Sequence, residues 1–279
     1  MADTDLTFGR LDDLAVAVED GTFGHASVLP RPLAAKRVGP LLELLMLRAR
    51  GRWPRGIVEM IGDGSFQDFM VALRSERNLW IDASGKQGFM RLGDAFGDDE
   101  EIRWTGFGLK MDKAMRAAGL PRGLAGQLVG ATKELHSNVY EHSERSRSGI
   151  VAFGVQDDNA EFIVADSGIG VLASLKCNPA HASLDRDGEA LRLALQPGVT
   201  RYAGEPMRGH GFDLMFTGLL NHGSKLRFRS GSAVVTIDGL GKDNPVPVIR
   251  DRPAMQGFLI AVDCHALRKS YLRRVDLSG

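Results

Sequence analysis

The stretch FIVADSGIG, from Phe162 to Gly170, joins an apolar run to an acid and two glycines. The four apolar residues 162–165 predict a buried strand. Asp166 ends that strand, where a carboxylate shielded by apolar neighbours can accept a hydrogen bond from an exocyclic amine. Gly168 and Gly170 permit backbone conformations closed to other residues, and they allow a ligand to approach the backbone closely. The alternative interpretation of this stretch is a tight turn that requires glycine.

A long helix is predicted upstream, over residues 123–142. One apolar stripe runs along it, formed by Leu124, Leu128, Leu135 and Val139. Glu134 and Asn138 are four residues apart, so on a helix they lie one turn apart on the same face. An amide oxygen in this position can ligate Mg²⁺, and a carboxylate can orient or deprotonate the group that attacks a phosphate. The alternative is an exposed helix face with two ordinary polar residues.

A third motif, Gly209-His210-Gly211, precedes a helix predicted over residues 212–220. Free backbone N–H groups at a helix start, with no side chains in the way, form a phosphate site. Arg208 stands immediately before the glycines, and Arg201 lies seven residues earlier. Either arginine can reach a γ-phosphate or remain a solvated loop charge, and the sequence leaves both interpretations open.

The three motifs, in this order and at these distances, resemble the N, G1 and G2 boxes of the GHKL ATPases. That superfamily includes gyrase, the Hsp-type chaperones, histidine kinases and MutL, and it is built on the Bergerat ATP-binding fold. The resemblance covers about residues 106–264. It looks strongest for the anti-sigma serine kinase and histidine kinase branch, because Glu134, Asn138 and His142 follow that branch's pattern. It implies a C-terminal two-layer α/β sandwich that binds Mg-ATP.

The resemblance also implies roles for individual residues. Asn138 matches the residue that holds Mg²⁺, Glu134 the general base, and Asp166 the residue that reads adenine. The other ATP-binding residues that it implies are Gly168, Gly170, Arg208, Gly209, His210, Gly211 and Phe212. One departure concerns the Gly-Thr pair that the family often places before its last strand, since this chain has Gly257-Phe258 there. Thr236 is a candidate for the missing hydroxyl, although a threonine in a strand is more often only a strand former.

Residues 1–105 are predicted to form a smaller α/β domain of unknown role ahead of the nucleotide-binding domain. Its predicted strands are 25–29, 57–61 and 79–81, and its predicted helices are 38–50 and 65–75, an order loosely similar to that of STAS domains. The acidic segment 93–101 is predicted to be a turn or linker. In the domain 106–265 the expected helices are 110–118, 123–142, 188–195 and 212–220, and the expected strands are 149–155, 161–165, 225–229, 233–237 and 258–262. Residues 266–279 are a basic C-terminal tail.

Composition limits the classes of protein. Of the 279 residues, 43% are hydrophobic and 25% are charged, which are globular values. Lys plus Arg equals Asp plus Glu at 35 each, so nucleic acid is not indicated as a partner. The two cysteines, Cys177 and Cys264, have no metal-ligand spacing, which favours a reducing cytoplasm. The N-terminus lacks the pattern of a signal peptide and no apolar run has the length of a membrane span, so no membrane partner is expected.

The leading functional hypothesis is a cytoplasmic Mg-ATP-binding regulatory protein of the GHKL type, either a protein kinase or an ATPase. It would use ATP for phosphoryl transfer to a protein partner or for slow hydrolysis. Two alternatives remain open: a dimerising ATPase clamp, and a nucleotide-dependent interaction module with little turnover. His136 is not expected to be a phosphoacceptor, because that residue of histidine kinases sits in a separate helix pair with its own signature, which this chain lacks.

Overall fold

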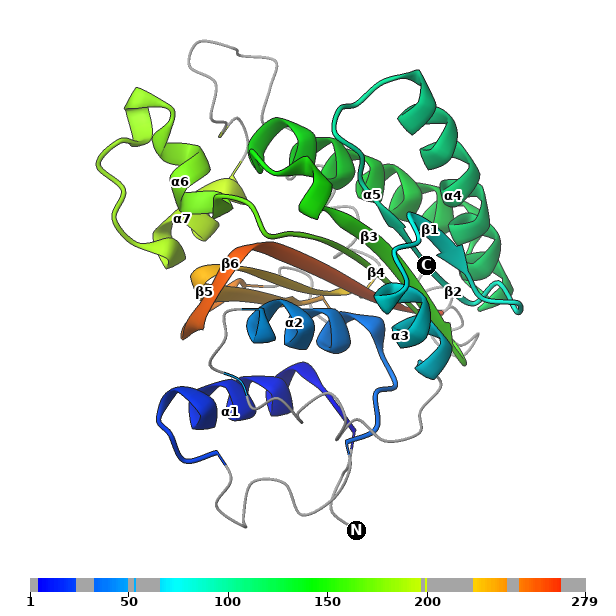
Figure 1. Ribbon diagram of the computed structural model, residues 1–279, viewed down its shortest axis with the longest axis horizontal. Coiled ribbons are helices and arrows are strands. Elements are labelled where there is room, and N and C mark those ends of the chain that lie inside the picture. Colours follow the sequence, from blue (N-terminus) through cyan, green and yellow to red (C-terminus); the bar gives the residue numbers. More distant parts are fainter. Residues whose placement is uncertain are drawn as a thin grey trace, which may run out of the picture.

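The computed structural model describes residues 5–23, 33–49, 53, 66–196, 199, 223–239 and 246–266. Within these residues the protein is a mixed α/β fold, with seven α-helices around one six-stranded antiparallel sheet (Figure 1). Two short 3₁₀ helices, Ser146–Ser148 and Pro179–His181, lie in connections. No described helix combines the length and the apolar character that crossing a membrane requires.

The sheet is built from strands that are mostly neighbours in the chain. Its strands are β1 (Leu79–Ile81), β2 (Gln87–Arg91), β3 (Ile150–Gln156), β4 (Asn159–Asp166), β5 (Lys225–Asp238) and β6 (Val248–His265). They lie in the order β1-β2-β3-β4-β6-β5, and each neighbouring pair is antiparallel. A tight turn at Asp157 and Asp158 joins β3 to β4, and Asp157 adopts the left-handed backbone conformation that such turns favour, with φ of 55°.

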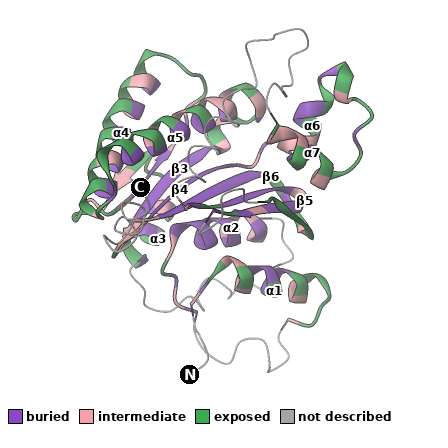
Figure 2. Ribbon diagram, turned by 180° about the vertical axis from the view of Figure 1, so that it is seen from behind, coloured by how far each residue is buried: buried purple, intermediate pink, exposed green. Residues whose placement is uncertain are grey.

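Helices cover both faces of the sheet, so the fold has three layers (Figures 1 and 2). One face is covered by α4 (Asp98–Ala117), α5 (Arg122–His142), α6 (Gly170–Lys176) and α7 (Asp187–Ala194). The other face is covered by α1 (Phe8–Glu19), α2 (Val38–Arg48) and α3 (Gln67–Arg74). The described part of residues 106–265 therefore supplies helices to one face only, and the second face is covered by the N-terminal helices.

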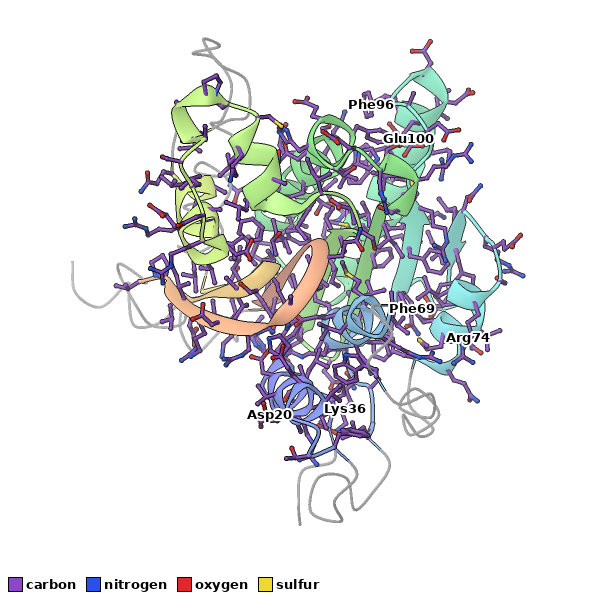
Figure 3. The ribbon with its side chains drawn as sticks, turned by 60° about the vertical axis from the view of Figure 1, so that its left-hand side comes forward. Asp20, Lys36, Phe69, Arg74, Phe96 and Glu100 are labelled. Atoms are coloured by element: carbon purple, nitrogen blue, oxygen red, sulfur yellow. The ribbon has the colours of Figure 1, made fainter. Side chains whose placement is uncertain are left out.

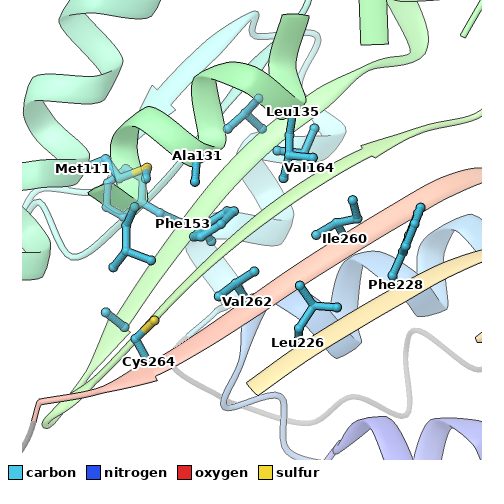
Figure 4. Packing of buried hydrophobic residues seen from close by; sticks show 14 of the residues in the cluster. Met111, Ala131, Leu135, Phe153, Val164, Leu226, Phe228, Ile260, Val262 and Cys264 are labelled. Carbon is cyan, nitrogen blue, oxygen red and sulfur yellow. The ribbon is translucent and has the colours of Figure 1, made fainter. Parts of the chain in front are cut away.

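Both faces of β4 are apolar, which explains why its sequence is a continuous apolar run rather than an alternating one. Phe162 and Val164 point into the core under α4 and α5, which Figure 4 shows from close by. Ile163 and Ala165 point into the second core, under α1 and α2. This alternation fixes the register of β4, because a slip of one residue would exchange the two faces.

Local signals position the helices. Thr7 caps α1, since its side-chain oxygen accepts a hydrogen bond of 3.2 Å from the backbone N–H of Arg10. Gly119 adopts a φ of +95° between α4 and α5, which lets the two helices turn back on each other. α2 has no capping side chain of its own, and the buried Glu161 of β4 accepts hydrogen bonds from the backbone N–H groups of Val38 and Gly39 instead.

Buried charges attach the N-terminal helices to the sheet. The guanidinium of Arg227 on β5 donates to Asp12 of α1 at 2.6 Å and to Glu43 of α2 at 2.7 Å. Arg229 also pairs with Glu43, and both of these side chains are fully buried. Burial by itself raises the pKa of Asp12, but the hydrogen bonds and charges of Arg227 and Arg252 outweigh it and hold that pKa below its usual value.

Several predicted elements are confirmed, among them strand 79–81 without change. The helices predicted over 38–50, 65–75, 123–142 and 188–195 are observed as Val38–Arg48, Gln67–Arg74, Arg122–His142 and Asp187–Ala194. The strands predicted over 149–155 and 161–165 are β3 and β4. Predicted elements 25–29, 57–61 and 212–220, and all of the basic tail except residue 266, lie outside the described residues.

Other predictions were wrong. Residues 98–101, predicted as part of an acidic linker, are the first turn of α4, because acidic side chains are favourable at a helix N-terminus. The strands predicted over 225–229 and 233–237 are one strand, β5, with irregular register around Gly231. The strand predicted over 258–262 is confirmed, as part of the longer β6. The sequence analysis missed α1, β2 and α6.

The boundary predicted at residue 105 lies inside α4. β1 and β2, which precede it, are hydrogen-bonded into the same sheet as β3 and β4, which follow it. β1 and β2 are antiparallel, so the described part of residues 1–105 does not by itself form the expected alternating strand and helix layer.

Candidate functional site

Asp166, the last residue of β4, has a buried carboxyl group, and only one of its two oxygens accepts a hydrogen bond from the described residues. Asp166 is 1% exposed, and its Oδ1 accepts a hydrogen bond of 2.6 Å from the backbone N–H of Gly168. Oδ2 is buried and has no hydrogen-bond partner among the described residues. Burial raises the pKa of Asp166 to about 7, and the Gly168 hydrogen bond offsets part of that rise. A buried acceptor without a donor is costly, so Asp166 is suited to receive a donor from a ligand.

The β6 backbone lies directly against Asp166 because residue 257 is a glycine. A Cβ atom at position 257 would overlap the backbone carbonyl oxygen of Asp166. Gly257 also has a φ of +74°, which side chains disfavour. Asp166 is paired with Phe258 across the β4–β6 ladder. The Gly257-Phe258 pair thus occupies the position at which the family resemblance places a Gly-Thr pair.

The turn after Asp166 is tied to the end of α5. The carbonyl oxygen of Ser143, the C-terminal cap of α5, accepts a hydrogen bond of 3.0 Å from the backbone N–H of Ile169. A Cβ atom on Gly168 would overlap that same carbonyl oxygen. The C-terminal end of the helix that carries Glu134 and Asn138 therefore lies against the turn that follows Asp166.

A serine that the sequence analysis missed links three segments next to this turn. The buried Ser230 of β5 accepts a hydrogen bond of 3.0 Å from the backbone N–H of Val171, in the first turn of α6. Its hydroxyl donates to the carbonyl oxygen of Gly257 at 2.7 Å. Ser230 pairs with Phe258 on β6, so it lies in the same row of the sheet as Asp166. Only the register of β5 against β6 reveals this role.

Thr236 does not support Asp166. It pairs with Val248, which lies ten residues before Phe258 on β6. Successive residues of a strand advance by about 3.3 Å, so Val248 and Phe258 are far apart. The suggestion that Thr236 supplies the missing hydroxyl was therefore wrong, and Ser230 is the hydroxyl that lies beside the Gly257 turn.

Glu134 and Asn138 lie on the flank of α5 that faces away from α4. Leu135 and Val139 point down into the sheet, and His136 is buried on the side of α4, where its Nε2 lies 3.0 Å from Glu100 Oε1. At 100° per residue, Glu134 and Asn138 fall on the opposite side of the Leu135 and Val139 stripe from His136. α6 and α7 stand on that side of α5, as Figure 1 shows. Glu134 is exposed and Asn138 half-buried, so both side chains can meet a ligand.

Contacts with α4 fix the rotation of α5 about its axis. His136 packs against Trp104, with ring centroids 5.0 Å apart, and against Phe96 at 5.8 Å. Figure 3 labels Phe96 and Glu100 close together at one end of α4. Burial lowers the pKa of His136, and the neighbouring Glu100 offsets this only in part. A fully buried, packed imidazole has no access to a phosphoryl donor, which agrees with the expectation that His136 is not a phosphoacceptor.

Gly170 begins α6 immediately after the Asp166 turn, with a φ of +79°. A Cβ atom there would lie 3.0 Å from Ser230 Oγ, so the glycine allows α6 to start close to β5. The third motif, Arg208 to Phe212, lies outside the described residues, as does Arg201. The structure thus brings together Asp166, Gly168 and Gly170 with the end of α5, and it gives no position for the third motif.

Few protein ligands for a metal ion lie near this site in the described part of the chain, so a cation there would take most of its ligands from water and phosphate oxygens. Among the residues that the structure describes, no group of three or more His, Cys, Asp or Glu side chains could hold a metal ion. Mg²⁺ is commonly held by one or two protein oxygens together with water and substrate phosphates. The amide oxygen of the half-buried Asn138 fits that arrangement.

No family model matches this chain, and no curated protein matches it either.

Proposed function

We propose that this protein binds ATP at the end of β4, in a site of the GHKL type on a Bergerat fold. The observation that carries the proposal is the buried Asp166 carboxyl group, whose Oδ2 has no hydrogen-bond partner among the described residues. The exocyclic amine of adenine is a donor that satisfies this acceptor. Guanine carries a carbonyl oxygen at the corresponding position, which would meet the carboxylate as a second acceptor. The site is therefore expected to select adenine.

The surrounding glycines support the same proposal. Gly168 and Gly257 have no room for a Cβ atom, because Ser143 and Asp166 lie against them. The resulting turn is held by backbone hydrogen bonds to Ser143 and through Ser230 to β6. A site held by fixed backbone contacts is preorganised, which reduces the ordering cost of binding.

Asn138 and Glu134 are proposed to act on the phosphate end of the nucleotide. Asn138 would hold Mg²⁺ through its amide oxygen, and the cation would neutralise charge on the phosphates. Glu134 would accept the proton of the attacking hydroxyl group or water. Because Glu134 is exposed, an acceptor can reach it from solvent, and this favours a protein hydroxyl or water as the attacking group.

The arrangement of layers also supports a Bergerat fold. The part of the described chain after residue 106 forms an antiparallel sheet with α5 lying over β4 and with helices on one face. We further propose that the protein works in the cytoplasm as a regulatory ATPase or protein kinase. Neither Cys177 nor Cys264 forms a disulfide, as a reducing compartment requires.

Calorimetric titration of the purified protein with Mg-ATP and with Mg-GTP tests the proposal. We expect saturable binding of Mg-ATP and at least tenfold weaker binding of Mg-GTP, a difference of about 1.4 kcal/mol or more. Phosphate release, measured for the wild type and for Glu134→Ala, then distinguishes the fates of ATP. Release that depends on Glu134 identifies an ATPase, and binding without release identifies a kinase that lacks its acceptor or a nucleotide-dependent switch. Absence of Mg-ATP binding contradicts the proposal.

A further inference from the structure

The outer face of α4 exposes two large apolar side chains among charged and small residues. Its inner face is buried against α5 and the sheet by Trp104, Phe107 and Met111. On the outer face, Ile102 is 70% exposed and Leu109 is 66% exposed. These two residues are seven apart, so they lie on one stripe of the helix, with the small residues Thr105 and Gly106 between them. Figure 2 shows α4 at the outer edge of the described part of the molecule.

The charges of α4 are divided between its two ends. Its first turn contains Asp98, Asp99, Glu100 and Glu101. Its C-terminal half contains Lys110, Lys113 and Arg116, and also Asp112, which pairs with Arg116. Asp98, Lys110 and Lys113 are exposed, so these charges are available at the surface beside the apolar stripe. A helix that is acidic at one end and basic at the other is complementary to an antiparallel copy of itself.

The positions of these residues satisfy a two-fold axis that passes between Thr105 and Gly106. About that axis, Ile102 is opposite Leu109 of the partner subunit. Asp98 is then opposite Lys113 of the partner subunit, whereas Glu101 pairs with Lys133 of its own chain. In such an isologous contact each pair occurs twice, so both the apolar and the charged contacts are doubled. Gly106 stands at the crossing, where a residue without a side chain permits close approach of the helices.

We infer that a second copy of this chain docks on α4, in an antiparallel helix pair. The occupant is another copy rather than an unrelated partner because one helix carries both complementary halves of the contact. A single helix pair is smaller than a standard interface of about 1,600 Å². The dimer is therefore weak and forms at high protein concentration. It depends on no residue of the proposed nucleotide site.

Sedimentation velocity across micromolar to millimolar protein concentrations, without nucleotide, tests the inference. The wild type is expected to pass from monomer to dimer, and added salt is expected to weaken the dimer because the charged pairs are screened. Ile102→Glu should weaken association at least tenfold. Val71→Glu is the matched control, since Val71 is 62% exposed on α3 and lies outside the proposed contact. Circular dichroism confirms that each variant is folded.

A charge exchange gives the sharper test. Asp98→Lys places two lysine pairs in its own dimer, and Lys113→Asp places two aspartate pairs in its own dimer. Each variant alone should therefore be monomeric at concentrations where the wild type is dimeric. An equimolar mixture should dimerise again, because both contacts in the mixed dimer are then attractive. A monomer at every wild-type concentration, or a dimer that these substitutions leave unchanged, overturns the inference.

Discussion

The backbone of Gly257 is packed against the backbone of Asp166 so closely that a Cβ atom at position 257 would overlap the Asp166 carbonyl oxygen. This contact joins the strand end that carries the buried carboxyl group to the bend in β6. Position 257, directly beside the proposed adenine-reading residue, must therefore be a glycine. The consequences for stability and for binding can be measured separately.

Gly257→Ala is expected to lower the free energy of unfolding by about 2–4 kcal/mol, because the new methyl group meets a backbone atom that cannot rotate away. Gly85→Ala is the matched control. Gly85 has a similar φ of +71°, but its Cβ position is open. That control should cost only about 1–2 kcal/mol, the strain of a left-handed residue. Urea denaturation measures both values, and equal losses would show that the contact with Asp166 contributes nothing.

Asp166→Asn is expected to change the pH dependence of stability. The pKa of Asp166 is raised by burial to about 7 in the folded protein, from 3.8. Between these values the folded state holds a proton that the unfolded state has lost, so the contribution of Asp166 to stability falls as pH rises from about 4 to about 7. The asparagine variant lacks this titration. It should gain roughly 2–4 kcal/mol relative to the wild type across that window and remain level above it.

Denaturant titrations at several pH values measure that difference. Glu161→Gln is a useful companion, because burial also raises the pKa of Glu161 to about 7, while Glu161 contacts α2 rather than the candidate site. It should show the same pH trend in stability and leave nucleotide binding unchanged. A stability difference between wild type and Asp166→Asn that does not vary with pH contradicts the assigned titration.

Asn138→Ala is expected to remove the Mg²⁺-dependent part of ATP affinity, raising Kd at least about tenfold in the presence of Mg²⁺. Glu134→Ala should keep ATP binding and stop phosphoryl transfer, because it removes the proposed base and not a binding contact. Gln127→Ala is the control, since Gln127 is exposed on α5 two turns before Glu134. Unchanged affinity of the Asn138 variant would remove the Mg²⁺ assignment, and continued turnover by the Glu134 variant would move the base elsewhere.

Glu43→Ala is expected to lower the free energy of unfolding by about 3–5 kcal/mol, because it removes one of the two carboxylates that pair with the buried guanidinium groups of Arg227 and Arg229 and leaves only Asp12. Lys36→Ala breaks the exposed pair with Asp5 and should cost less than about 1 kcal/mol. Urea unfolding of both variants provides the comparison. A loss at position 43 as small as that at position 36 would show that α1 and α2 are not held to the sheet by this network.

The sequence contained the local features of the fold but not the contacts between distant segments. α5 was predicted to within one residue because its apolar stripe is long and regular. β2 was missed because it has a short, mixed sequence and forms by pairing with β3. Arg227 and Arg229 alternate along β5 as a polar strand face would, yet both are buried. The sequence does not show this, because Asp12, which pairs with Arg227, lies 215 residues away in the chain.

The residues of the candidate site were likewise predictable from the sequence only in part. Asp166, Gly168 and Gly170 were identified from an apolar run followed by an acid and glycines, and the structure brings them together. Ser230 could not be identified, because a lone serine in a strand has no sequence signal and its role depends on the register of β5. The pairing of β2 with β3 joins strands from both sides of residue 105 in one sheet, and no local sequence signal indicates a pairing between such distant segments.

The most direct test of the central claim is calorimetric titration of wild type and Asp166→Asn with Mg-ATP and Mg-GTP at a pH above 7, where the wild-type carboxyl group is mostly ionised. The proposal predicts that the wild type binds Mg-ATP and prefers it to Mg-GTP. It also predicts that the folded Asp166→Asn variant loses most of that preference, with ATP affinity reduced at least about tenfold. Equal affinity and equal preference in the two proteins would contradict the assignment of Asp166 as the residue that reads adenine.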